Sequence, residues 1–197
     1  MDNNDILDST EALFASKNIH FTLAELSQKL GVKPPSLYNH SKSKEEIIRF
    51  TIFREIDNFF VYVNQVIESL SDETLEVCLE KFFKQTLSYF NSLQKARFWR
   101  QLSLLEPGFK VQFSVYRAER EATMKKKLDE IFDLLAFELK MTVQKKQGAF
   151  TLMYIMMQGL IEIRVMSDSV HLTETLLDLS WDNYLQGLKN KPELDVY

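Results

Sequence analysis

The sequence predicts an all-α protein, and two observations support this fold class. Glycine occurs 5 times and proline 4 times in 197 residues, and neither occurs in residues 36–106. A β-sandwich or β-barrel of that length would need a turn signal roughly every 8–12 residues. The apolar side chains of residues 44–70 instead recur at the spacing of an amphipathic helix. β-rich folds and glycine-rich nucleotide-binding folds are therefore disfavoured.

The first three expected helices are short and are separated by clear end signals. A helix over residues 5–17 comes first. Thr22 and Glu25 form a capping box, in which two side chains satisfy free backbone amides at the start of a second helix. Gly31 ends that helix, because glycine is a usual residue just past a helix C-terminus. Pro34 opens a third helix, since the first turn needs no N–H group at that position.

The sequence pattern predicts six further helices in the remainder of the chain. Ser43 and Glu46 form a second capping box, which opens a helix over residues 44–70. Further helices are expected over residues 72–93, 95–105, 109–140, 143–167 and 173–188. Charged residues at positions 117–121 interrupt the apolar pattern, so we expect a break within the helix over residues 109–140.

Charge and cysteine content restrict the class of protein. The chain has 24 Lys and Arg against 28 Asp and Glu, a net charge of −4, which excludes a globally basic nucleic-acid binder but not a local basic patch. The single cysteine, Cys78, forms no internal disulfide and fits a reducing cytosol. The acidic N-terminus does not resemble a signal peptide, and charges interrupt the most apolar segment, residues 149–166. We therefore expect a cytoplasmic protein without membrane association.

The second and third helices have the spacing of a helix-turn-helix unit, joined by the turn Gly31, Val32 and Lys33. Positive charge gathers at this unit. Residues 26–44 contain four lysines and no acid, whereas residues 1–25 contain one lysine and five acids. DNA recognition requires positive charge here, because a recognition helix enters the major groove while its flanks contact phosphates.

The N-terminal segment resembles the TetR family of bacterial one-component regulators, through residues 21–26, 30–32, 35–40 and 42–47. The resemblance implies phosphate contacts by Thr22, Tyr38, His40 and Lys44, and groove-facing side chains at Lys33, Pro35, Ser36 and Asn39. Of these, Asn39 can read adenine through two hydrogen bonds, and Lys33 can reach a guanine or a phosphate.

Two positions depart from the family pattern. Ser41 stands where an apolar residue is usual, which weakens a core contact. Lys33 stands where a capping serine is common, so the third helix is expected to lack its usual cap.

The last two helices are too apolar for a single buried face. Residues 149–163 leave only a narrow polar stripe, so this helix must be buried on two sides. The resemblance implies a four-helix dimer interface, and the alternative is a central helix of a monomeric bundle. The expected interface residues are Met153, Met156, Gly159, Leu160, Trp181, Tyr184 and Leu185.

Aromatic residues gather in residues 78–139. We expect an effector pocket in this region, because such pockets are mostly apolar with few polar groups. Its expected lining is Phe98, Trp99, Arg100, Tyr116 and Met124. A plain hydrophobic core is the alternative explanation for each of these residues.

The residue pattern does not predict an enzyme. The three histidines have no metal-ligand spacing, and no phosphate-binding glycine loop or G-x-S-x-G nucleophile motif occurs. No catalytic residue, metal or cofactor is expected.

The resemblance instead implies a DNA-binding domain over residues 1–48, followed by an effector-binding and dimerisation domain over residues 49–197. We expect a homodimeric regulator, most simply a repressor that binds a palindromic double-stranded DNA operator and is released by a small-molecule effector. The alternative is a helical ligand-binding or protein-interaction dimer that does not bind DNA.

Overall fold

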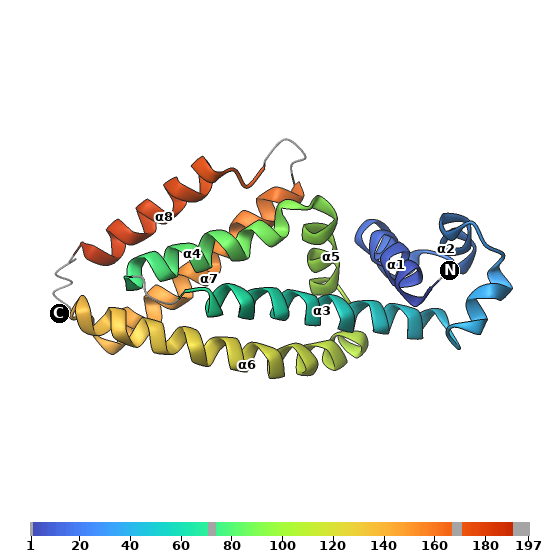
Figure 1. Ribbon diagram of the computed structural model, residues 1–197, viewed down its shortest axis with the longest axis horizontal. Coiled ribbons are helices and arrows are strands. Elements are labelled where there is room, and N and C mark those ends of the chain that lie inside the picture. Colours follow the sequence, from blue (N-terminus) through green and yellow to red (C-terminus); the bar gives the residue numbers. More distant parts are fainter. Residues whose placement is uncertain (1, 71–73, 167–170, 191–197) are drawn as a thin grey trace. The chain divides into compact units, whose positions relative to one another are not determined.

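The computed structural model describes residues 2–70, 74–166 and 171–190, and regular structure within them is entirely helical (Figure 1). The all-α prediction is confirmed. The elements in order, with η marking a 3₁₀ helix, are α1 (Asn3–Lys17), η1 (Asn18–His20), α2 (Leu23–Leu30), η2 (Pro34–Asn39), α3 (Lys44–Glu68), α4 (Leu75–Ser88), η3 (Tyr89–Asn91), α5 (Leu93–Ser103), α6 (Pro107–Glu138), α7 (Val143–Met166) and α8 (Glu174–Lys189). The predicted helix ends at residues 72 and 167 lie outside the described residues.

The predicted break at residues 117–121 is wrong, because α6 continues through them. Arg117 and Glu121 are one turn apart, and Arg117 Nε lies 3.7 Å from a Glu121 carboxylate oxygen. Such a pair supports a solvent-facing stretch of helix. Charge interrupts the apolar pattern there, but no residue interrupts the backbone.

The helix predicted over residues 72–93 is instead divided, into α4 and η3. Thr74 caps α4, whose last turn tightens into η3, and Ser92 caps α5 by accepting a hydrogen bond from the Lys95 amide at 3.5 Å. Serine favours helix N-termini because its hydroxyl satisfies a free amide. The chain therefore starts a new helix at Leu93 without a glycine or proline.

The chain forms two compact units. Unit 1 comprises residues 1–62 and 92–123, and unit 2 comprises residues 63–91 and 124–197. Helices α3 and α6 each contribute residues to both units. The sequence predicts a boundary between a DNA-binding and an effector-binding domain at residues 48 and 49. These compact units do not test that functional boundary, which stays a prediction.

In unit 1, α1 packs against α2, η1 and α5. The Phe14 ring of α1 lies 4.9 Å from the Phe98 ring of α5, and both side chains are fully buried. Leu26 of α2 and Leu37 of η2 are also buried. The short helices near the N-terminus are thus held by a core that extends to α5.

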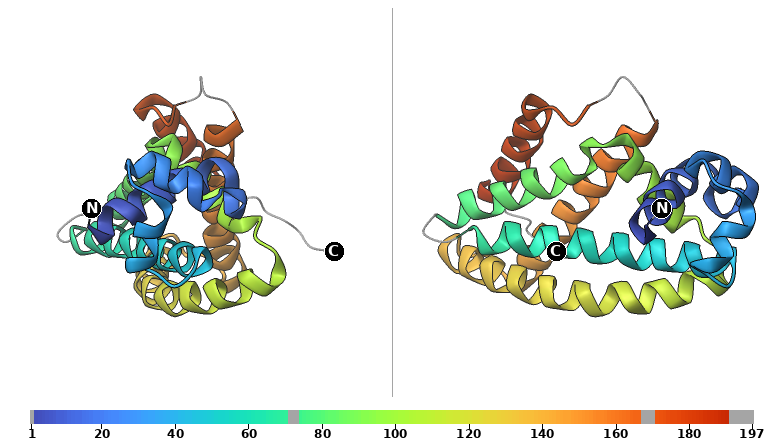
Figure 2. Two further views of the ribbon diagram at one scale, coloured as in Figure 1. Left: turned by 90° about the vertical axis from the view of Figure 1, so that its right-hand side faces the viewer. Right: turned by 45° about the vertical axis from the view of Figure 1, so that its right-hand side comes forward.

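In unit 2, α4 contacts both α7 and α8 (Figure 2). Trp181 of α8 is buried, with its ring 5.8 Å from that of Phe83 and 5.4 Å from that of Tyr184. The buried Tyr184 hydroxyl donates to the Ala149 carbonyl of α7 at 2.9 Å. Burial raises the pKa of Tyr184 far above its ordinary value, so the phenol stays neutral and keeps this bond.

Tyr184→Phe is expected to lower the free energy of unfolding by about 1 kcal/mol, because it removes one buried hydrogen bond and keeps the ring. Urea denaturation monitored by circular dichroism measures the change. Tyr38→Phe is the matched control, since that side chain is exposed, and it is expected to leave the stability unchanged. Equal effects of the two substitutions would contradict a contribution from the Tyr184 bond.

Candidate nucleic-acid interface

Helix α2 begins and ends as the sequence predicts. The Thr22 hydroxyl accepts from the Glu25 amide at 3.1 Å, and the Thr22 amide donates to the Glu25 carboxylate at 2.8 Å, which confirms the capping box. Gly31 ends the helix with φ +67°, a left-handed conformation that favours glycine. The Val32 amide then donates to the Ser27 carbonyl at 3.0 Å, which fixes the turn into η2.

The third predicted helix is a 3₁₀ helix rather than an α-helix. Its first turn is closed by a hydrogen bond from the Ser36 amide to the Lys33 carbonyl at 2.9 Å. Lys33 provides no side-chain cap, as expected from its identity. Leu37, 1% exposed, anchors η2 in the core of unit 1.

The remaining side chains of this segment lie mostly at the surface. Tyr38 is 59% exposed, and Ser36 is half-buried. The other exposed residues with a predicted DNA role here are Lys33, Pro35, Asn39 and His40. The His40 Nδ1 atom lies 2.9 Å from the Asn3 side-chain oxygen, so the first turn of α1 orients this ring. One surface of η2 and its flanks therefore carries most of the predicted DNA-contacting residues.

Ser41 compensates for the missing apolar side chain with hydrogen bonds. It is buried, and its hydroxyl donates to the Glu46 carboxylate at 2.8 Å. The Lys42 amide donates to the same carboxylate at 2.7 Å. These bonds hold the pKa of Glu46 below its ordinary value, the Lys42 amide having the largest effect. The Ser43 hydroxyl accepts from the Glu46 amide at 3.1 Å, so half of the second capping box forms, while the carboxylate serves the preceding turn.

Lys44 has a structural role that the sequence does not reveal. Its ammonium donates to the Ile19 carbonyl at 2.8 Å and to the Phe21 carbonyl at 3.0 Å, and it lies 5.4 Å from the centre of the Phe21 ring. Two of its three N–H donors are thereby used. Lys44 joins the start of α3 to the segment that precedes α2, and its phosphate contact stays a prediction.

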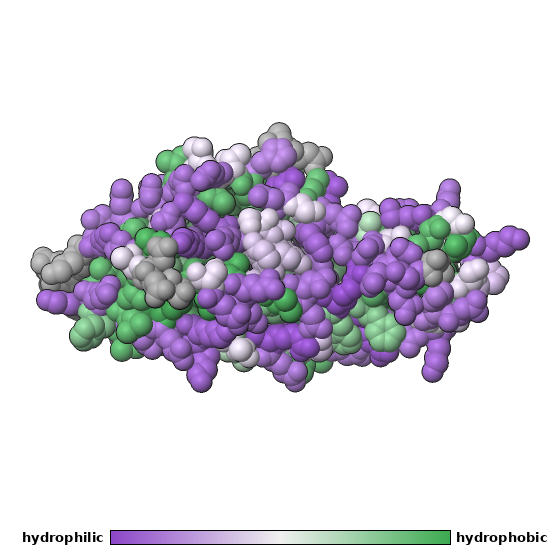
Figure 3. All heavy atoms as spheres, viewed as in Figure 1, coloured by the Kyte–Doolittle hydropathy of each residue, from purple (hydrophilic) through white to green (hydrophobic). Residues whose placement is uncertain are grey.

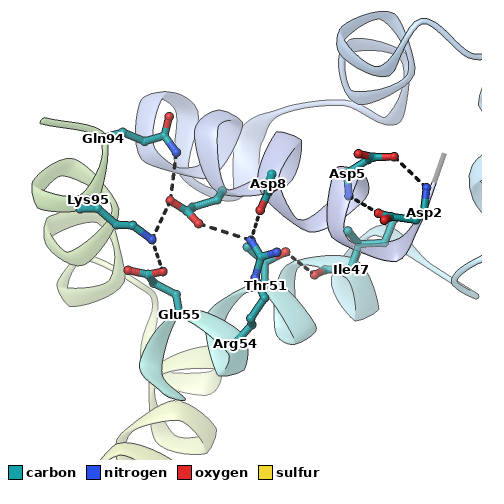
Figure 4. A network of polar contacts seen from close by, with 10 residues as sticks. Asp2, Asp5, Asp8, Ile47, Thr51, Arg54, Glu55, Gln94 and Lys95 are labelled. Carbon is teal, nitrogen blue, oxygen red and sulfur yellow. Dashed lines mark hydrogen bonds and ion pairs between the residues drawn. The ribbon is translucent and has the colours of Figure 1, made fainter. Parts of the chain in front are cut away.

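A buried polar network lies behind this surface, still within unit 1 (Figure 4). Lys95 of α5 pairs with Glu11 of α1 at 3.2 Å and with Glu55 of α3 at 2.5 Å. Both carboxylates are buried. Arg54 of α3 pairs with Asp8 at 2.8 Å and with Glu11 at 3.4 Å. Ion pairs that share the buried carboxylates of Glu11 and Glu55 thus join α1, α3 and α5.

Sequence analysis missed this network, although a signal exists. Glu11 lies four residues after Leu7 and three before Phe14, and Glu55 lies three residues after Ile52. These spacings place both acids on the apolar faces of their helices. A carboxylate on an apolar face implies a buried cationic partner, but not which one, because Lys95 is far from both in sequence.

The predicted effector-pocket residues occupy different surroundings. Phe98 belongs to the core against Phe14. The Trp99 indole donates to Glu55 at 3.3 Å, Arg100 is exposed, and Tyr116 donates to Asp57 at 2.7 Å. Met124 is half-buried in unit 2, whereas the other four lie in unit 1.

A surface hollow of about 500 Å³ opens in unit 1, between α1 and α3. Its lining includes Ile6, Leu7, Phe50 and Arg54, and none of the five predicted pocket residues. Within the described residues, no group of three or more His, Cys, Asp or Glu is placed to hold a metal ion.

Four predicted dimer residues are already buried within the chain: Met153, Leu160, Trp181 and Tyr184. Met156 and Leu185 are half-buried, and Gly159 is exposed. The large exposed apolar side chains of α7 are instead Val143, Leu152, Tyr154, Ile155, Ile163 and Met166, each 48–72% exposed. Figure 3 also shows apolar residues at the surface near the end of α6, where Leu134 and Phe137 are exposed.

Among the described helices, α7 alone is long and apolar enough to cross a membrane, with a mean hydropathy of 1.3 in its most apolar window. About one third of that window, 33%, is buried against the protein. Core helices of water-soluble proteins share this composition, so the apolar character of α7 is weak evidence for a membrane span.

Lys95→Met is expected to lower the free energy of unfolding by about 3 kcal/mol, because it leaves two buried carboxylates without their shared cation. Adding Glu55→Gln should restore part of the loss, and urea denaturation measures both. Lys189→Met is the matched control, since Lys189 pairs with Glu76 at the surface and such pairs contribute about 0–1 kcal/mol. A loss no larger than that of the control would contradict the network's importance.

Residues 6–49 match the sequence model of the family described as bacterial regulatory proteins, tetR family. The match covers α1, α2, η2 and the start of α3. No curated protein matches the chain by sequence.

Solved structures match the fold along nearly the whole chain. A transcriptional regulator from Rhodococcus sp. Rha1 is 15% identical with a TM-score of 0.70, over 98% of this chain and 100% of that one. FadR from Bacillus subtilis, solved in complex with stearoyl-CoA, is 17% identical with a TM-score of 0.68, over 96% and 98%. A TetR family transcription regulator from Marinobacter aquaeolei is 15% identical with a TM-score of 0.65, over 93% of each chain.

The sequence match confirms the resemblance inferred from residues 21–26, 30–32, 35–40 and 42–47. The sequence match identifies the N-terminal helices, and the structural matches extend the same fold through α8. Residues 6–49 therefore match the helix-turn-helix segment of the tetR family, and the chain as a whole shares its fold with solved transcriptional regulators.

Proposed function

We propose that the protein is a cytoplasmic transcriptional regulator that binds a palindromic operator as a homodimer, represses transcription, and is released by a small-molecule effector. One observation carries the DNA-binding proposal. Leu37 holds η2 in the core of unit 1, while the exposed residues of η2 and its N-cap are Lys33, Pro35, Tyr38 and Asn39. Exposed polar and aromatic side chains on a rigid support are suited to contact a partner.

The charge around η2 supports a phosphate-bearing partner. Lys29, Lys33 and Lys42 are exposed, and no acidic residue occurs between Leu26 and Lys44. Basic residues that flank a recognition element contribute affinity through release of counterions from DNA. We assign phosphate contacts to Thr22, Tyr38, His40 and Lys44, and groove contacts to Lys33, Pro35, Ser36 and Asn39.

The exposed apolar face of α7 supports dimerisation. Leu152, Ile155 and Ile163 lie at the surface on a helix whose opposite residues are buried, and large apolar patches mark interaction sites. A second copy is the occupant that the DNA proposal requires, because a two-fold dimer presents two recognition elements to a palindrome. The interface thus uses exposed neighbours of the predicted residues, together with Met156, Gly159 and Leu185.

Release by an effector would act through a shift between two conformations. FadR, which has a similar fold, was solved with stearoyl-CoA, and this supports a ligand site in residues 49–197. A ligand that binds one conformation more tightly shifts the population toward it. Movement of α3 would change the separation of the two η2 elements in a dimer, and half-site spacing on DNA tolerates little change.

Selection from a random DNA pool tests the proposal. The bound sequences are expected to contain an inverted repeat, and a duplex built from them then serves in fluorescence anisotropy titrations at several salt concentrations. Recovery of no enriched sequence by the full-length protein would contradict DNA recognition.

Lys33→Ala is expected to weaken binding to that duplex and to reduce the slope of log affinity against log salt concentration by about 1, because one positive charge at the DNA surface and the counterion that it displaces are lost. Tyr38→Ala should weaken binding without changing the slope, since tyrosine is neutral. Lys126→Ala is the control, an exposed lysine of α6 outside the proposed interface. An affinity unchanged in both variants would exclude η2 as the contact surface.

Ile155→Glu is expected to convert the dimer into a monomer, because it places a charge in the proposed apolar interface. Sedimentation equilibrium measures the mass. Leu104→Glu is the control, an exposed leucine in unit 1, and it should leave the dimer intact. A wild-type monomer, or a dimer that persists in Ile155→Glu, would contradict this interface.

A further inference from the structure

Arg164 of α7 is a buried cation with too few partners. Its side chain lies within unit 2, and the residue is 5% exposed. Nη2 donates to the Asn91 carbonyl at 3.3 Å. Nε and Nη1 are buried without a hydrogen-bond partner, and no carboxylate of the described residues forms an ion pair with this guanidinium.

This arrangement is energetically unfavourable as it stands. Arginine remains charged under all ordinary conditions, and removing an ion from water costs several kcal/mol unless a partner compensates. Other cations in the buried regions do have carboxylate partners. Lys95 pairs with Glu11 and Glu55, and Arg54 pairs with Asp8 and Glu11. Arg164 thus requires an anion that these residues do not provide.

The side chains around Arg164 indicate the chemical character that a bound anion would need. Arg164 continues the buried stripe of α7 that contains Met153, Met157 and Leu160. This helix packs against α4 and η3, where Leu87 and Phe90 are buried. Methionine side chains adapt their shape to irregular apolar partners. These side chains would offer apolar contacts to a ligand whose negatively charged end pairs with the guanidinium.

We propose that Arg164 binds the carboxylate of a small apolar monocarboxylic acid, and that this acid is the effector. A single guanidinium balances a single negative charge, and an apolar site disfavours any excess charge. A monocarboxylate therefore fits better than a phosphate dianion. Charge-assisted hydrogen bonds from the free N–H donors would hold the acid. This inference rests on the proposed function only in naming the ligand as the effector.

Binding to the full-length protein tests the site directly. The probes are octanoate, dodecanoate and benzoate, each compared with its uncharged methyl ester by isothermal titration calorimetry. At least one acid is expected to bind about tenfold or more tightly than its ester, the effect of a hydrogen bond to a charged group. Arg164→Met should remove this preference, and Arg164→Lys should keep part of it. No preference in the wild type, or the same preference in Arg164→Met, would overturn the proposal.

Stability provides a second readout. Without any acid, Arg164→Met should leave the melting temperature unchanged or raise it, because an apolar side chain replaces an uncompensated buried charge. A marked fall would show that the chain itself compensates the charge of Arg164, which would overturn the proposal. Arg117→Met, on the exposed surface of α6, is the control and should change neither the melting temperature nor acid binding.

The DNA readout separates this inference from the proposed function. The preferred acid should release wild-type protein from its selected duplex, while Arg164→Met should bind the duplex normally and resist release. Acid binding with no DNA binding by the wild type would contradict the proposed function and leave the Arg164 site intact. DNA binding that persists with the acid bound would overturn the assignment of the acid as effector.

Discussion

The ammonium of Lys95 pairs with two buried carboxylates at once, those of Glu11 and Glu55. Glu11 and Glu55 come from different helices, and burying a carboxylate is costly unless a cation compensates its charge. Their shared cation comes from a third helix, α5. The relative placement of α1, α3 and α5 in unit 1 is therefore restricted to arrangements that keep all three groups together. A hydrophobic contact would tolerate sliding, but a charge with two partners does not.

This restriction reaches the exposed surface of η2 through α1. Asn3 of α1 contacts His40, and Lys44 at the start of α3 holds the carbonyls of Ile19 and Phe21. Helices α1 and α3 thus contact residues next to η2 and α2, and the buried charges connect both helices to α5. A change of state in α5 would reach the residues proposed to contact DNA through polar bonds as well as through packing. Such a connection is the physical requirement for coupling between two sites.

Local chemistry made much of the fold predictable from sequence. The Thr22 capping box and the Gly31 turn depend on residues a few positions apart, so the sequence alone predicts them. The 3₁₀ form of η2 was not predictable, because Pro34 indicates where a helix begins but not which hydrogen-bond pattern it takes. The sequence also did not predict which apolar residues of α7 face the protein and which face solvent. Met153 and Ile155 are both apolar, and only the packing of α4 and α8 decides that the first is buried and the second exposed.

The tighter winding of η2 determines how its side chains would be spaced along DNA. A 3₁₀ helix has three residues per turn and rises about 2.0 Å per residue, so residues three positions apart stand directly above one another. Ser36 and Asn39 form one such row, and Pro35 and Tyr38 form another. Members of a row are separated by about 6 Å, close to two base-pair steps of roughly 3.4 Å. Each row would therefore address alternate rather than adjacent base pairs, which limits how many consecutive positions one half-site can specify.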